Sequence, residues 1–243
     1  MIKKKISGLI FLKTIIYTNI VFFIISIIVS GKNLSFSLNP FKALTPSTLS
    51  LILLGASGTV PINNNHAWWS LISANFLHGS LLHILFNMLA LYQIGSLVSS
   101  VYGKYRMYMI FIVSGVTGFY LSYLAGTNVT LGASAAVCGL IGATLYYGKS
   151  RGGILGQSIY KQTITWVIMI GLFGILIPNV DNWGHGGGII SGISLGWMLG
   201  YNEKSIENKF HKFFSIILMG VTFCVLTWSI IFCFIFLFLN SSV

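Results

Sequence analysis

Long, uninterrupted apolar stretches are the feature that most limits what this chain can fold into. A helix needs about 20 mainly apolar residues to cross a bilayer. The chain is 55% hydrophobic and only 7% charged, whereas a soluble domain averages about 25% charged residues. We therefore predict an all-α polytopic membrane protein with seven spans, at about 14–30, 80–99, 107–125, 133–148, 162–178, 184–201 and 213–239.

The basic residues fall almost entirely on alternate sides of these spans. Only two of the 14 lysines and arginines, Lys32 and Lys42, lie on the second side. The positive-inside rule then predicts a cytoplasmic N-terminus and an external C-terminus. The net charge of +11 is explained by this bias and by anionic lipid, and we expect no nucleic-acid binding because no binding motif accompanies it. The twelve residues on the predicted cytoplasmic side are Lys3, Lys4, Lys5, Lys13, Lys104, Arg106, Lys149, Arg151, Lys161, Lys204, Lys209 and Lys212.

The spans divide the chain into four regions. Residues 1–30 form a cytoplasmic N-terminus and a first span, which we expect to be a retained signal-anchor because no A-x-A cleavage site follows. Residues 31–79 form an outer loop, whose apolar segment 49–56 is too short to span and is expected at the interface or dipping into the bundle. Residues 80–201 hold the five following spans, and residues 202–243 hold a solvated turn and the seventh span.

Four polar residues from three spans are predicted to lie at similar depth near the outer face. His83 and Asn87 share one face of the second span, because residues four apart are neighbours on a helix. Ser134 begins the fourth span and His185 lies near the outer end of the sixth. Ionisable groups at membrane depth are costly and are therefore functional candidates.

These residue types suit nucleophilic catalysis. A serine hydroxyl is a weak nucleophile until a base such as neutral imidazole takes its proton. The oxyanion that follows needs donors, and a helix N-terminus offers free N–H groups. The sixth span has a glycine at every fourth position from Gly184 to Gly200, including Gly188 and Gly192. Small residues allow close helix contact in lipid, so we expect this span to pack tightly on the fourth.

Three stretches carry a resemblance to a known family. They are FLHGSLLHILFNM at 76–88, GAS at 132–134 and HGGGIISG at 185–192. Together and in this order they resemble the rhomboid intramembrane serine proteases. The resemblance implies a six-helix core with one additional C-terminal helix and a protease that uses no metal or cofactor. Its partners would be the lipid bilayer and a transmembrane protein substrate cleaved near the outer face. From the small size and simple organisation of the chain we expect the bacterial inner membrane as its location.

The resemblance also implies roles for individual residues. Ser134 would be the nucleophile and His185 the general base, in a dyad without an acid. His83, Asn87 and the backbone N–H of Ser134 would bind the oxyanion. We expect supporting roles for Gly132, Gly188, Gly192 and His78, with His78 fixing a loop through hydrogen bonds.

The chain departs from the family pattern at three places. Ala135 replaces the last glycine of the usual GxSG motif, and Trp68-Trp69 stands where Trp-Arg is usual. Cys138 occupies a position that is aromatic in some members. A catalytically inactive relative that binds membrane clients is therefore the alternative, and a small transporter is a third hypothesis.

Two further residues have alternative interpretations. Gly55-Ala56-Ser57-Gly58 matches GxSG better than residues 132–135 do, which makes Ser57 a rival nucleophile, but it lies in the outer loop. Asp181 lies four residues before His185 and could bond to it, although a role in the turn or on the loop surface is favoured.

Overall fold

The chain folds as a bundle of helices, as predicted. The computed structural model describes residues 2–39 and 42–240, and in these ranges β pairing is limited to two isolated bridges, Ser35 with Thr45 and Ser57 with Thr130. The long helices are α1 (Ile2–Ser30), α5 (Leu81–Tyr102), α6 (Lys104–Leu124), α7 (Ser134–Arg151), α8 (Gly153–Leu176), α9 (Asn182–Leu199) and α10 (Lys209–Asn240). The short helices are η1 (Gly31–Asn33), α2 (Thr48–Leu53), α3 (Thr59–Asn65), α4 (Ser70–Ser73) and η3 (Ala74–Phe76).

Five of the described helices are long and apolar enough to cross a membrane, whereas the sequence predicted seven spans. The five segments are Gly8–Asn33, Leu81–Tyr102, Lys104–Leu124, Gly153–Leu176 and Lys209–Leu239. The predicted fourth and sixth spans do form helices, α7 and α9, but these have 18 residues each and many glycine and polar residues. Most of α7 is buried against other helices, whereas α9 also exposes Trp183, Ile190, Trp197 and Met198.

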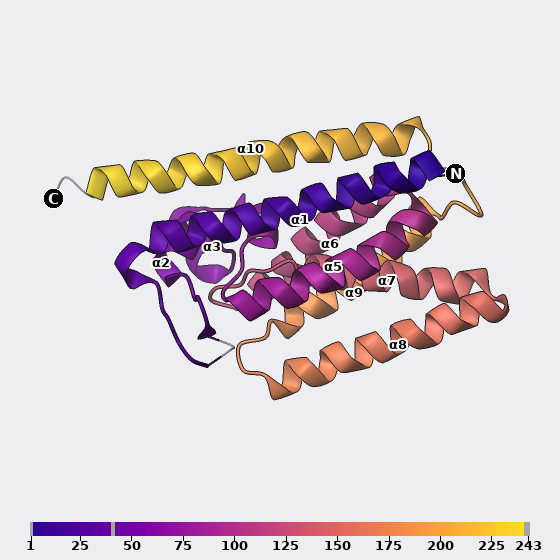
Figure 1. Ribbon diagram of the computed structural model, residues 1–243, viewed down its shortest axis with the longest axis horizontal. Helices are drawn as coiled ribbons and strands as arrows, with labels where there is room; N and C mark the ends of the chain where they lie inside the picture. The colour runs from indigo at the N-terminus through magenta and orange to yellow at the C-terminus, as the bar shows by residue number, and fades with distance from the viewer. Residues whose placement is uncertain (1, 40–41, 241–243) are drawn as a thin grey trace.

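The bundle is built around α7 and α9. Figure 1 shows them in the middle, and α6 packs against both. Helix α5 packs on α7 and α1, and α8 packs on α7. Helix α10 runs along α6 and the short helices α2 and α4. The ring of Trp69, the N-cap residue of α4, meets that of Phe232 on α10, with centroids 5.9 Å apart, so this half-buried tryptophan packs against the last helix.

Glycine sets the distance between α7 and α9, as the sequence indicated. A Cβ atom added at Gly188 would overlap the carbonyl of Ala135, and one added at Gly192 would overlap the carbonyl of Gly139. These backbones therefore touch, which is the close approach that small residues permit.

The two ends of the bundle differ in content. One end, which we call the basic end, holds the N-terminus, the α7–α8 turn and the loop 200–208 before α10 (Figure 1). The other end, the loop end, holds segments 31–39, 42–80, 125–133 and 177–181.

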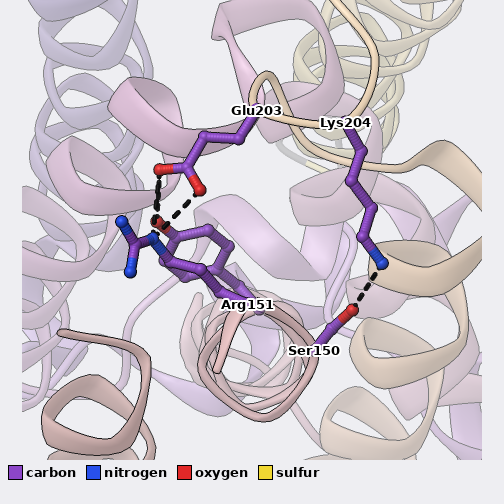
Figure 2. A network of polar contacts seen from close by, with 5 residues as sticks. Ser150, Arg151, Glu203 and Lys204 are labelled. Carbon is purple, nitrogen blue, oxygen red and sulfur yellow. Dashed lines mark hydrogen bonds and ion pairs between the residues drawn. The ribbon is translucent and has the colours of Figure 1, made fainter. Parts of the chain in front are cut away.

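Specific contacts close the basic end. Figure 2 shows the carboxylate of Glu203 against the Arg151 guanidinium, with an N–O distance of 3.0 Å, and the Lys204 amine 2.8 Å from the Ser150 hydroxyl. Oε1 of Glu207 accepts hydrogen bonds from the first backbone N–H groups of α6. Glu203 and Lys204 are exposed, so the turn is solvated at its surface, and its acids also join loop 200–208 to α6 and α7.

The loop end is folded too. Of the predicted interfacial segment 49–56, Leu51, Leu53, Leu54 and Ala56 are buried in the core. The segment therefore dips into the bundle, which is the second of the two expected placements.

Candidate active site

The side chains of Ser134 and His185 meet at the loop end. Ser134 is the first residue of α7, and His185 lies in the first turn of α9. The Ser134 Oγ atom is 2.8 Å from the His185 Nε2 atom. This is hydrogen-bonding distance, so the imidazole can take the hydroxyl proton when Nε2 is the acceptor.

The other ring nitrogen of His185 lies in a protein interior. Nδ1 is buried and has no hydrogen-bond partner in the described part of the chain. When Nε2 accepts from Ser134, the neutral ring carries its own proton on Nδ1. Within the described residues, no carboxylate therefore bonds to His185 to complete a triad. The pair resembles the serine–histidine dyad that the family resemblance implies.

His83 and Asn87 of α5 line the same cavity as Ser134 and His185. Nδ1 of His83 accepts a hydrogen bond from the backbone N–H of Gly79, at 3.3 Å. The neutral ring then has its proton on Nε2, where it can be donated. The Asn87 amide donates one proton to the His83 carbonyl, at 2.9 Å, and carries a second.

Gly132 lets the His83 ring approach the start of α7. Its φ of +123° disfavours any other residue, and a Cβ atom there would lie 2.6 Å from Nε2 of His83. The same added atom would lie 3.8 Å from the Ser134 Oγ atom. The donor nitrogen of His83 and the Ser134 hydroxyl therefore both lie close to this glycine.

His78 lies behind this arrangement and is fully buried. Burial lowers the pKa of His78 well below its ordinary value, and the neighbouring His83 lowers it further. A neutral ring can accept a hydrogen bond, and Nε2 of His78 accepts a long one, 3.5 Å, from the backbone N–H of Ala133. This contact with the loop before Ser134 is the kind that the expected loop-fixing role requires.

The cavity measures about 1090 Å³ and extends from Ser134 between α5, α7 and α8. Its polar groups gather at the Ser134 end, whereas α8 contributes apolar side chains: Trp166, Met169, Ile170 and Phe173. The sequence analysis did not predict this apolar wall. No motif marks these residues, because an apolar residue that lines a cavity in a membrane helix is indistinguishable in sequence from one that faces lipid.

The departures from the family pattern at Ala135 and Cys138 are accommodated within the bundle. Ala135 is buried and packs with Ala74 and Phe119, opposite Gly118 of α6. Cys138 lines the cavity and contacts the α9 backbone near Gly188. Neither of these side chains separates Ser134 from His185.

The rival nucleophile lies elsewhere. Ser57 is completely buried, accepts a hydrogen bond from the Ser70 hydroxyl at 3.1 Å, and is not among the residues that line the cavity. Its backbone pairs with Thr130. The GxSG match at 55–58 is therefore part of the loop packing.

Comparison with known proteins agrees with the motifs and the geometry. A family model described as the rhomboid domain matches residues 65–202. The chain belongs to the rhomboid family. This match covers Ser134, His185, His83 and Asn87, so the whole candidate site of this rhomboid lies inside the shared domain.

Individual relatives are similar at about one third identity. The chain is 33% identical over 163 residues to rhomboid protease GluP of Bacillus subtilis, which covers 67% of this chain and 32% of GluP. It is 34% identical over 158 residues to RHOMBOID-like protein 4 of Arabidopsis thaliana, covering 64% of this chain and 40% of that protein. RHOMBOID-like protein 1 of the same plant is 32% identical over 200 residues, covering 76% and 51%. The similarity thus spans between a third and about half of these relatives' lengths.

Proposed function

We propose that this rhomboid is an active serine endopeptidase that cleaves a transmembrane segment of another membrane protein. The observation that carries the proposal is the 2.8 Å distance between the Ser134 Oγ and His185 Nε2 atoms. Two further features support it. Donors from His83 and Asn87 face the same cavity, and the cavity is large enough for an extended peptide segment.

The chemistry follows from this arrangement. Ser134 Oγ attacks the substrate carbonyl carbon while its proton passes to His185 Nε2. The negative charge on the carbonyl oxygen is stabilised by N–H groups at the start of α7 and by His83 and Asn87. The C–N bond then breaks, the leaving amine takes the proton from His185, and water repeats the sequence on the acyl-enzyme.

The apolar wall on α8 fits a substrate that comes from the membrane. A stable helix hides its backbone carbonyls, so a cleavable segment must unwind locally before Ser134 can attack it. We expect such a segment to be apolar and to contain small residues. By the charge bias of the loops, the site faces the outer side of the membrane, and we propose the bacterial inner membrane as its location.

Labelling with a fluorophosphonate probe tests the proposal. The probe reacts with activated serines, so the purified wild type in detergent should label, whereas Ser134→Ala and His185→Ala should not. Ser57→Ala is the matched control and should label as the wild type does. An active rhomboid labelled alongside verifies the assay.

The alternative is a rhomboid that binds membrane clients without cleaving them. A folded wild type that fails to label beside the active control would contradict the proposal and favour this alternative. Labelling that survives Ser134→Ala would contradict the assignment of the nucleophile.

A further inference from the structure

One carboxylate joins the segments that carry Ser134 and His185. Asp181 precedes α9, and its side chain accepts hydrogen bonds from three different segments. The sequence analysis favoured a turn or surface role for this residue. The structure gives it contacts with α6, with the loop before α7 and with α9 itself.

The first set of contacts fixes the turn that holds His185. Asp181 is the N-cap of α9, and its Oδ1 atom accepts a hydrogen bond from the Gly184 backbone N–H at 2.9 Å. Its carbonyl oxygen accepts from the His185 backbone N–H at 3.0 Å. Asp181 thus sets the direction in which the α9 backbone leaves the loop, and with it the place of the imidazole.

The second set reaches the segment that holds Ser134. The Oδ2 atom of Asp181 accepts from the Thr130 hydroxyl at 2.5 Å, and Thr130 lies four residues before Ser134. Thr130 is further held by a pair of backbone hydrogen bonds to Ser57, of 2.8 and 2.9 Å. The same Oδ2 atom accepts from the hydroxyl of Ser122, in the last turn of α6, at 2.5 Å.

Asp181 does not bond to the His185 ring as the acid of a catalytic triad would. Both of its oxygens are engaged with other segments, and Nδ1 of His185 has no partner in the described residues. Asp181 does not act on the reacting atoms, so any effect on the chemistry is indirect.

We propose that Asp181 is a positioning residue, which sets the separation of Ser134 and His185 by linking loop 125–133 to the first turn of α9. This inference rests on the proposed function. The physical reason is that rates depend steeply on the placement of reacting groups, so that a shift of about 1 Å can cost about 100-fold. The link crosses between two segments that are 51 residues apart in the chain.

Three variants distinguish the contacts of Asp181 with Ser122 and Thr130 from its role as the N-cap of α9. Asp181→Ser keeps a good N-cap residue but is too short to reach Ser122 and Thr130. Thr130→Val removes the hydroxyl from the other side with little change of shape. Asp181→Asn keeps both functions, because its amide can cap α9 through oxygen and donate to the two hydroxyls.

The rate of fluorophosphonate labelling per folded molecule is the first measurement. Asp181→Ser should label about 10- to 100-fold more slowly than the wild type, and Thr130→Val should be slower by a smaller factor. The double variant should be no slower than Asp181→Ser alone, because both changes break one link. Asp181→Asn should stay within about threefold. Thr165→Val, whose hydroxyl bonds to a carbonyl within α8, is the control and should label at the wild-type rate.

Amide hydrogen exchange gives a readout that needs no activity. Loosening of the link should speed exchange at the backbone N–H groups of Ser57 and Thr130 in Asp181→Ser. If folded Asp181→Ser and Thr130→Val both label at the wild-type rate, the positioning role is wrong while the proposed function stands. If the wild type takes no probe, the proposed chemistry itself is wrong, and the role fails with it. If Asp181→Ser does not fold, Thr130→Val alone decides the question.

Discussion

The basic end and the loop end of this rhomboid use their few polar groups in opposite ways. At the basic end, Arg106 is completely buried and donates to the carbonyls of Leu199, Gly200 and Ser205 and to the side chain of Asn202. At the loop end, ring nitrogens of His78 and His185 are buried without a partner in the described residues. The basic end thus ties one guanidinium to four oxygens of the chain and leaves only Nε of Arg106 without a described partner, whereas the loop end leaves one ring nitrogen of each histidine without one, and His185 lines the cavity.

The difference indicates that the contacts that stabilise the fold and the groups of the candidate site lie at opposite ends of the bundle. Two of the three acids of the chain, Glu203 and Glu207, join helices at the basic end. The third, Asp181, joins segments at the loop end, next to the candidate site. Substitutions at the basic end should therefore lower stability, whereas substitutions in the candidate site should lower the rate.

The largest effect on rate is expected for His185→Ala. Without the base, the Ser134 proton has no acceptor, and labelling and cleavage should fall at least about 10³-fold. The thermal unfolding temperature should change little, because the one side-chain hydrogen bond described for His185 is the bond to Ser134 beside the cavity, and its Nδ1 has no partner in the described residues. A variant that loses both activity and its fold would contradict the assignment of stability to the basic end and of rate to the loop end.

Asn87→Ala should lower kcat about 100-fold through loss of an oxyanion donor. KM for a membrane reporter should stay nearly constant, because the donor acts on charge that develops in the transition state. Initial rates over a range of reporter concentrations in proteoliposomes measure both constants. A rise of KM at constant kcat would show instead that Asn87 binds the substrate in its ground state.

Arg106→Met tests whether a substitution at the basic end lowers stability and leaves activity unchanged. The change leaves four partly buried acceptor oxygens without their donor, and we expect the free energy of unfolding to fall by about 3 kcal/mol. Activity per folded molecule should remain near that of the wild type. Unfolding in mixed detergent micelles measures the first quantity, and active-site titration with the probe measures the second. A stable variant with lost activity would contradict the division of roles.

The smallest effect is expected for Ala135→Gly, which restores the GxSG pattern. Loss of one buried methyl group and the greater freedom of glycine should lower stability by about 1 kcal/mol. The labelling rate should change less than about threefold, because the methyl group packs on Ala74 and Phe119 and not on the reacting atoms. A large gain in rate would mean that Ala135 restrains the site.

Sequence reasoning reached the site because its residues follow local patterns. Ser134 and His185 begin helices whose depth can be inferred from loop charges, and the glycine spacing of α9 predicts its contact with α7. The roles of Arg106 and Asp181 could not be predicted in this way. In the sequence Arg106 looks like any other basic loop residue, and only the fold shows that it is buried. The hydroxyls that bind Asp181 come from positions 51 and 59 residues away, so no local pattern marks them.

Cleavage of a single-pass reporter in proteoliposomes tests the central claim most directly. The reporter carries an apolar segment with small residues, and mass spectrometry identifies the product ends. The account predicts that the wild type and Ser57→Ala cut the reporter within or beside its membrane segment, and that Ser134→Ala leaves it intact. Cutting by Ser134→Ala at the wild-type rate would contradict it.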